Sequence, residues 1–143
     1  MYPVEFAKRL LLIAETVNRW GGALAALDRK RRAKVARYAE AIADTLGRAA
    51  QFSARLAKAP SDKAAQRGLI REFGRITGYL ETLVGVLQHH LDGRKLAGVK
   101  RRLEQLGPNP GNAAGDTAAT GKRVDRLLAA EGYFRALADS LNV

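Results

Sequence analysis

The residues in this sequence best suited to chemistry are two adjacent histidines, His89 and His90, which lie close to Asp92. Neighbouring side chains on a helix point about 100° apart, so this pair cannot easily bind one metal ion. No glutamate has a histidine three residues later, as a di-iron helical bundle requires. The sequence contains no cysteine, which excludes thiolate metal sites and cysteine nucleophiles. We therefore expect no metal site.

Two further patterns resemble a nucleotide site and a catalytic site, but each lacks essential parts. Residues 115–123, GDTAATGKR, have five residues between the glycines, where a P-loop has four, and an arginine where it has a hydroxyl residue. The serines Ser53, Ser61 and Ser140 have no histidine or acid at a suggestive spacing. We expect no catalytic residue, no cofactor and no enzymatic activity.

Basic residues are the strongest chemical signal in the sequence. The 25 Lys and Arg outnumber the 14 Asp and Glu, which gives a net charge of +11. Such an excess attracts an anionic partner, which can be nucleic acid, an acidic membrane leaflet or an acidic protein surface. The alternative for the first basic cluster is a solvated face that keeps the protein soluble. The candidate anion-binding residues are Arg29, Lys30, Arg31, Arg32, Lys34, Arg37, Lys100, Arg101 and Arg102.

The apolar residues that must position these side chains recur at steps of four and three, the period of one face of an α-helix. The clearest stripe predicts a helix over residues 61–91, and the same period predicts helices over 3–20, 23–59 and 122–141, with a short helix ending at Gly107-Pro108. No β pattern is visible. We predict a single all-α domain over residues 1–143, an up-down bundle of four main helices plus one short helix. The stripe of the 61–91 helix comprises Leu69, Phe73, Ile76, Leu80, Leu83 and Leu87.

Glycine and proline indicate where the predicted helices end. Gly21-Gly22 should end the first helix, and Pro60-Ser61 should join the second and third helices as an antiparallel hairpin, with Ser61 as the N-cap. Residues 107–121 hold four glycines and two prolines without periodicity, which predicts a flexible loop before a C-terminal brace helix over 122–141.

Three glycines inside the third predicted helix, Gly74, Gly78 and Gly85, project to one side together with Arg67 and Arg71. Each costs a helix roughly 0.5–1 kcal/mol relative to alanine, so three need a reason. Close packing against another helix of the bundle is one explanation, and a helix kept easy to deform is another. The third is a shallow groove for a partner helix or a second copy of the chain, and we predict this groove, with self-association through it.

The order of these predicted elements resembles the HeLo-type four-helix-bundle domain of the mixed-lineage-kinase-like cell-death proteins. The resemblance spans most of the chain and includes the long basic second helix, the leucine-rich third helix, the segment Asp92-Gly93-Arg94-Lys95 and the closing brace helix. It implies that Arg29, Lys30, Arg31 and Arg32 contact anionic phospholipids under restraint from the brace helix. It also implies a role in cell-death or defence-type signalling.

The amino-terminal apolar run at residues 10–14 is bracketed by charges, so it predicts neither a signal peptide nor a membrane span. We expect a cytoplasmic protein, peripheral to membranes where it meets them. Its predicted function is that of a non-enzymatic interaction module that engages an anionic surface, above all acidic membrane lipids. The alternative is a nucleic-acid-binding accessory subunit that uses non-specific phosphate contacts. Tyr38 is the only nearby ring and belongs to an apolar stripe, so sequence-specific reading is not expected.

Overall fold

The chain folds as an all-α bundle, and the prediction of an all-α fold is confirmed. The computed structural model describes residues 3–88, 90–91, 93–105 and 117–142, and this part of the chain contains no strand. Its helices are α1 (Pro3–Arg19), α2 (Gly21–Ala25), α3 (Arg29–Lys58), α4 (Lys63–Leu87), α5 (Gly93–Gln105) and α6 (Thr117–Leu141).

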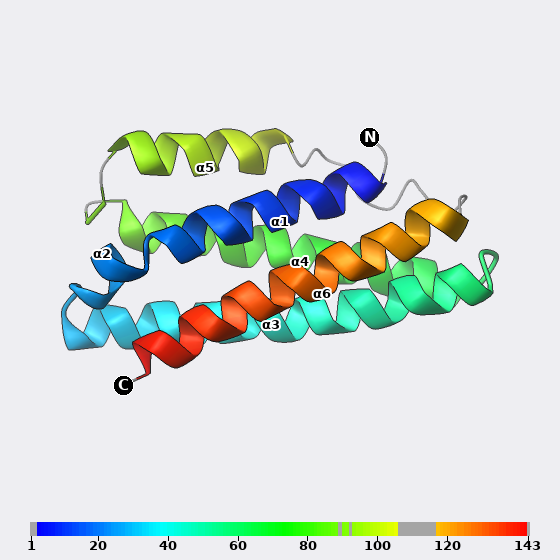
Figure 1. Ribbon diagram of the computed structural model, residues 1–143, viewed down its shortest axis with the longest axis horizontal. Coiled ribbons are helices and arrows are strands. Elements are labelled where there is room, and N and C mark those ends of the chain that lie inside the picture. The colour runs from blue at the N-terminus through cyan, green and yellow to red at the C-terminus, as the bar shows by residue number, and fades with distance from the viewer. Residues whose placement is uncertain (1–2, 89, 92, 106–116, 143) are drawn as a thin grey trace.

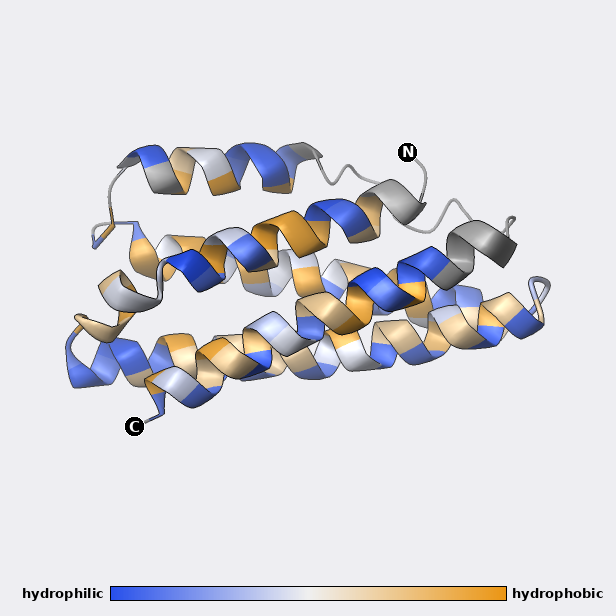
Figure 2. Cartoon of the chain, viewed as in Figure 1, coloured by the Kyte–Doolittle hydropathy of each residue, from blue (hydrophilic) through white to orange (hydrophobic). Residues whose placement is uncertain are grey.

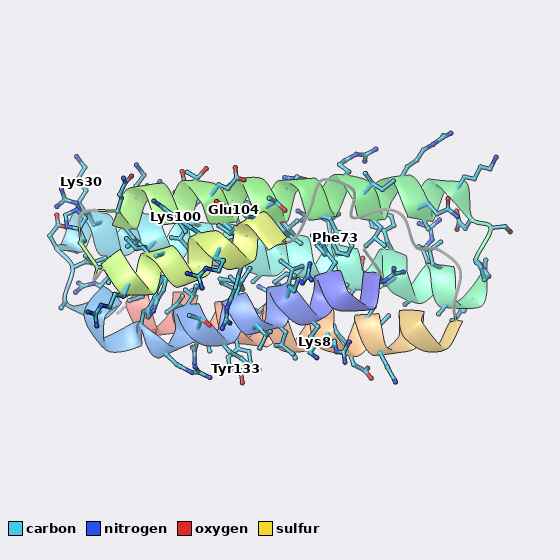
Figure 3. The ribbon with its side chains drawn as sticks, turned by 90° about the horizontal axis from the view of Figure 1, so that it is seen from above. Lys8, Lys30, Phe73, Lys100, Glu104 and Tyr133 are labelled. Atoms are coloured by element: carbon cyan, nitrogen blue, oxygen red, sulfur yellow. The ribbon has the colours of Figure 1, made fainter. Side chains whose placement is uncertain are left out.

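The long helices lie roughly along one axis and alternate in direction along the chain (Figure 1). A short turn joins α3 to α4 as the predicted antiparallel hairpin. The final helix, α6, packs most extensively against α3 and also lies along α1. The short helix α5 covers α1 and α4 from outside, as the view from above shows (Figure 3). Its contact surface with the rest of the bundle is much smaller than that of α1, α3, α4 or α6.

The leucine-rich stripe of α4 forms the centre of the core, as its spacing predicts. All six of its members are buried, and the ring of Phe73 lies 4.3 Å from that of Phe6 on α1, centroid to centroid. Full burial of such a side chain contributes about 1.5–3 kcal/mol, so this stripe is a main source of stability. Apolar and polar residues alternate in bands along each helix (Figure 2).

A second contact surface, between α3 and α6, is made by small residues. Gly47 of α3 lies beneath Glu131 of α6, whose carboxylate oxygen would be 3.0 Å from an added Cβ. Small side chains allow two helices to approach closely, which explains why this pair packs most extensively. The buried alanines of this surface and its neighbourhood are Ala36, Ala39, Ala43, Ala49, Ala50, Ala130 and Ala138.

The prediction of one continuous helix over residues 23–59 is wrong at its amino-terminal end. The first predicted helix ends where expected, because α1 stops at Arg19, just before Gly21-Gly22. These glycines then begin the short helix α2, and the backbone leaves the helical path before α3 starts at Arg29. Asp28 is the N-cap of α3 and has extended backbone geometry, as aspartate favours at that position. The polar Asp28 therefore separates two helices where a periodic pattern predicts one.

Three other boundaries also differ from prediction. Asp62, one residue after the predicted cap Ser61, accepts a hydrogen bond from the Ala65 N–H at 3.0 Å and is the N-cap of α4. The same helix ends at Leu87, before the predicted end at residue 91. Residues 117–121 form the first turn of α6, so the predicted loop is wrong there, because the alanines extend the helix across Gly121. Residues 107–116 lie outside the described part of the chain.

Candidate functional site

The first turns of α3 place cations where a helix least favours them. The amino-terminal end of a helix carries a partial positive charge, so each basic residue there costs typically 0.3–1 kcal/mol. No acidic residue occupies the first turn of α3. The four cations Arg29, Lys30, Lys34 and Arg37 are exposed and have no ion-pair partner among the residues that the structure describes. We call these four residues the basic face of α3.

Two predicted members of this cluster are engaged inside the chain. Arg31 pairs with Asp28, with 3.1 Å between the guanidinium nitrogen and the carboxylate oxygen, and Arg32 donates to the Ala25 carbonyl at 3.4 Å. Both bonds brace the turn between α2 and α3. The structure therefore divides the predicted cluster into two braces and the four residues of the basic face.

Beside the basic face, a hollow of about 270 Å³ lies between α3 and α4. Its walls include the rings of Tyr38 and Tyr79, whose centroids are 6.4 Å apart with an interplanar angle of 56°. Lys34 and Arg37 form part of its lining, and Ala41 completes it. Sequence reasoning missed this site because it assigned Tyr38 to the core, whereas both rings are half-buried and meet only across the α3–α4 contact.

Tyr79 is held by a neighbour on its own helix. Arg75 donates to the Tyr79 hydroxyl at 3.4 Å, and this hydrogen bond raises the pKa of Arg75. The Arg75 guanidinium also lies 3.9 Å from Glu72, one turn earlier. The tyrosine hydroxyl thus connects the hollow to an ion-pair network deeper in the groove between α3 and α4.

The second half of α3 has cations that the chain itself neutralises. Arg48 donates to Glu72 at 3.1 Å and to the Thr45 hydroxyl at 3.2 Å, and the Glu72 side chain is only 6% exposed. Arg55 pairs with Asp62 at 3.0 Å. These residues hold α3 to α4 and have partners for their charges.

The predicted basic residues of α5 also fall into two sets, one exposed and one bonded to the rest of the chain. Lys100 and Arg101 are exposed without an ion-pair partner among the described residues, whereas Arg102 reaches back to α1. Its guanidinium donates to the Thr16 hydroxyl at 3.2 Å and to the Leu12 carbonyl at 3.4 Å. Arg102 therefore fastens α5 to the bundle, and Lys100 and Arg101 remain candidates for anion contact.

The glycines of the predicted groove face open space. A Cβ added at Gly74, Gly78 or Gly85 would meet no described heavy atom within 4 Å, so the explanation by close packing inside the bundle is wrong. Arg67 and Arg71 are exposed on the same helix, and the groove for a partner stays a prediction. The glycine that packing does require is Gly68, where a Cβ would lie 2.5 Å from the Phe52 ring.

The other sequence patterns have structural positions where they are described. Residues 117–123 of the glycine-containing pattern are helical, so this part cannot form a phosphate-binding loop. Ser53 is buried and accepts a hydrogen bond from Arg123 at 2.9 Å, and burial lowers the pKa of Arg123 to about 10. His90 is exposed, and His89 and Asp92 lie outside the described residues.

Among the residues that the structure describes, no group of three or more His, Cys, Asp and Glu side chains could hold a metal ion. No helix in that part of the chain is both long enough and apolar enough to cross a bilayer.

Comparison with known proteins returned no match: no family model, curated protein or solved structure is significantly similar to this chain. The resemblance to HeLo-type domains therefore stays a prediction.

Proposed function

We propose that the protein is a non-enzymatic interaction module whose basic face binds an anionic surface, above all acidic membrane lipids. The observation that supports this proposal is the set of four exposed cations at the amino-terminal end of α3, which have no ion-pair partner among the described residues. Arg29 and Lys30 lie in the first turn of α3, where the helix dipole opposes positive charge, so an external anion would compensate a cost that the fold does not.

A second, separate group of positive charges lies on α5, across the bundle from α3 (Figure 1). Lys100 and Arg101 lie on the outer side of this helix, while Leu96, Val99 and Leu103 face the bundle. The apolar face of α5 is thus occupied by the bundle, so this helix offers a partner only its exposed cations. Lys30 and Lys100 project from different helices, which suits a broad anionic surface (Figure 3).

The expected strength of binding follows from the number of cations. Each Lys or Arg near an acidic leaflet contributes about 1 kcal/mol, so the four residues of the basic face give about 4 kcal/mol. This free energy corresponds to a dissociation constant of about 1 mM. Binding should weaken as salt is added, because the charges are exposed.

Vesicle co-sedimentation tests the proposal directly. We expect the purified chain to sediment with vesicles that contain phosphatidylserine or cardiolipin at low salt, and to stay in the supernatant with neutral phosphatidylcholine vesicles. Retention in the supernatant with all three vesicle types would rule out the membrane proposal.

A second candidate function is non-specific binding of nucleic acid, and one observation favours it. Lys30, Lys34 and Arg37 follow one side of α3 over about 10 Å and end at two tyrosine rings that could stack on bases. Affinity should then fall steeply with salt and be similar for all sequences. If neither single-stranded RNA nor duplex DNA shifts in mobility at about 50 mM salt, this candidate is eliminated.

We also propose that the open glycine side of α4 serves self-association, in line with the signalling role that the HeLo resemblance implies. Leucine at Gly78 would fill the groove, in which an added Cβ meets nothing. If copies pair there, the wild-type chain should sediment as a dimer or larger species and the Gly78→Leu variant as a monomer. A wild-type chain that sediments as a monomer at all concentrations, free and on vesicles, would contradict this part.

A further inference from the structure

We propose that the hollow between α3 and α4 binds a nucleoside phosphate, with its base against Tyr38 and Tyr79 and its phosphate between Lys34 and Arg37. This inference goes beyond binding to a membrane surface, because it requires a site for one small molecule. It shares Lys34 and Arg37 with the basic face but adds two aromatic residues that surface attraction does not need.

The tyrosine rings form two inclined walls suited to a flat ring. Their centroids are 6.4 Å apart and their planes meet at 56°, so neither ring covers the face of the other. Aromatic pairs are favourable in offset-stacked or edge-to-face arrangements with centroids about 4.5–7 Å apart. A base stacked on one ring would present its edge to the other, and a hollow of about 270 Å³ has room for it.

Two features maintain the shape of this hollow. Arg75 donates to the Tyr79 hydroxyl at 3.4 Å and thereby restrains that ring. Ala41 contributes only a methyl group to the lining, so the space between the rings stays open. The site is thus present without movement of either helix.

The charges at the hollow complete the match to a phosphate ester. Arg37 offers the planar donor pair that binds phosphate in a bidentate way, and Lys34 supplies a compact positive charge one turn earlier on α3. Lys30 precedes Lys34 by a further turn, within reach of a second phosphate. None of the described residues that line the hollow is acidic.

The two halves of the site define the ligand by its chemistry. Inorganic phosphate would contact only the cations, and a nucleoside would contact only the tyrosine rings. The shared chemistry is a base that bears a phosphate. Its source is either a free nucleotide or one nucleotide of a single strand.

Calorimetric titration of the full chain at low salt tests the site with ATP, AMP, adenosine, inorganic phosphate and a short oligoadenylate. We expect saturable binding of ATP or AMP, with adenosine and phosphate each much weaker. Binding of the oligoadenylate without free nucleotides would support the site with a strand as its source. Failure of all nucleotides and the oligoadenylate to bind would overturn the inference.

Variants separate this site from the basic face. Tyr38→Ala should weaken nucleotide binding at least about fivefold, the effect of losing one stacking ring. Ala41→Leu should fill the hollow and abolish nucleotide binding without removing any core side chain. Circular dichroism confirms that each variant is folded, and Lys58→Ala, an exposed lysine at the far end of the same helix, serves as the control that leaves nucleotide affinity unchanged.

The same variants distinguish failure of this inference from failure of the membrane proposal. Tyr38→Ala and Ala41→Leu should bind acidic vesicles as the wild type does, because they retain all cations. If both variants bind nucleotide with unchanged affinity, the rings form no part of the site and the inference is wrong, whatever the vesicles show.

Discussion

The two halves of α3 both contain basic residues but differ in whether acids of α4 and its N-cap pair with them, with exposed Lys58 as the exception in the second half. In the second half, Arg48 and Arg55 pair with Glu72 and Asp62, which belong to α4 and its N-cap. In the first half, Arg29, Lys30, Lys34 and Arg37 have no such partner among the described residues. The difference lies in what α4 offers opposite each half: carboxylates near its beginning and a tyrosine ring near its end.

This comparison shows that a basic residue acquires its role from the helix packed beside it. Opposite the second half, acidic residues form ion pairs with Arg48 and Arg55 and so hold the α3–α4 hairpin together. Those arginines therefore stabilise the fold. Opposite the first half, no acid is present among the described lining residues of the hollow. The charges there remain available to a partner.

Removal of the unpaired charges should have the largest effect. The triple variant Lys30→Ala/Lys34→Ala/Arg37→Ala should bind acidic vesicles about 100-fold more weakly, at about 1 kcal/mol per charge lost. Its stability should rise by about 0.3–1 kcal/mol, because Lys30 opposes the helix dipole in the first turn, while Lys34 and Arg37 are exposed and lie beyond that turn. Vesicle titration and urea unfolding measure the two quantities.

The matched control changes the net charge equally but elsewhere. Lys58→Ala/Lys63→Ala/Lys122→Ala also removes three exposed lysines, and it should retain most of the vesicle affinity. Equal losses in both triple variants would show that net charge alone matters and that the first half of α3 has no special role.

Loss of a paired arginine should show the reverse pattern. Arg48→Met removes the closest partner of the buried Glu72 carboxylate, so unfolding free energy should fall by about 2–3 kcal/mol, the cost of leaving a buried charge poorly paired. Vesicle affinity should stay nearly constant. Urea unfolding of Arg48→Met and of Arg48→Met/Glu72→Leu checks the cause, since removal of both partners should recover stability; no recovery in the double variant would refute it.

Glycines of α4 should also differ between the two halves. Gly68→Ala would force a methyl group against the Phe52 ring, and stability should fall by about 1–2 kcal/mol. Gly78→Ala enters open space and should raise stability by about 0.5–1 kcal/mol through helix propensity. Thermal unfolding measures both changes, and a destabilising Gly78→Ala would disprove the open groove.

The smallest effect concerns acid sensitivity at the paired end. Hydrogen bonding from the Ala65 N–H, with help from Arg55, lowers the pKa of Asp62 below its ordinary value of 3.8. The stabilisation is therefore present above pH 3.8 and is lost as the pH falls through the lowered pKa. Asp62→Asn keeps a capping side chain but not the charge, so it should be slightly less stable than wild type near neutral pH and equal to it below the lowered pKa. Unfolding across a pH series checks this, and a constant difference at all pH values would contradict it.

Much of the fold could be predicted from local pattern because it depends on local physics. The stripe from Leu69 to Leu87 has helical spacing and is too apolar for solvent, so both its helix and its burial follow from the residues themselves. The α3–α4 hairpin follows from two long helices joined by a short turn. Helix boundaries such as those at Asp28 and Asp62 were harder to predict, because several polar residues near a helix end can each act as its cap.

The candidate site was only half predictable. The basic cluster is visible in sequence, but which members are neutralised is not. Arg102 meets Thr16, 86 residues away along the chain, and Arg48 meets Glu72, 24 residues away. Tyr38 and Tyr79 approach each other only because two antiparallel helices bring them to the same level. No spacing rule within a single helix predicts such pairs.

The sequence by itself determined that this chain forms amphipathic helices, buries their leucines and has an excess of positive charge, since these properties arise within one or two helical turns. Tertiary structure alone decided which arginines became internal ion pairs, which glycines faced a ring and which faced open space, and where two tyrosines met. The reason is physical: helix formation depends on neighbours in sequence. The environment of an exposed charge depends on the helices packed around it, and these are often distant in the sequence.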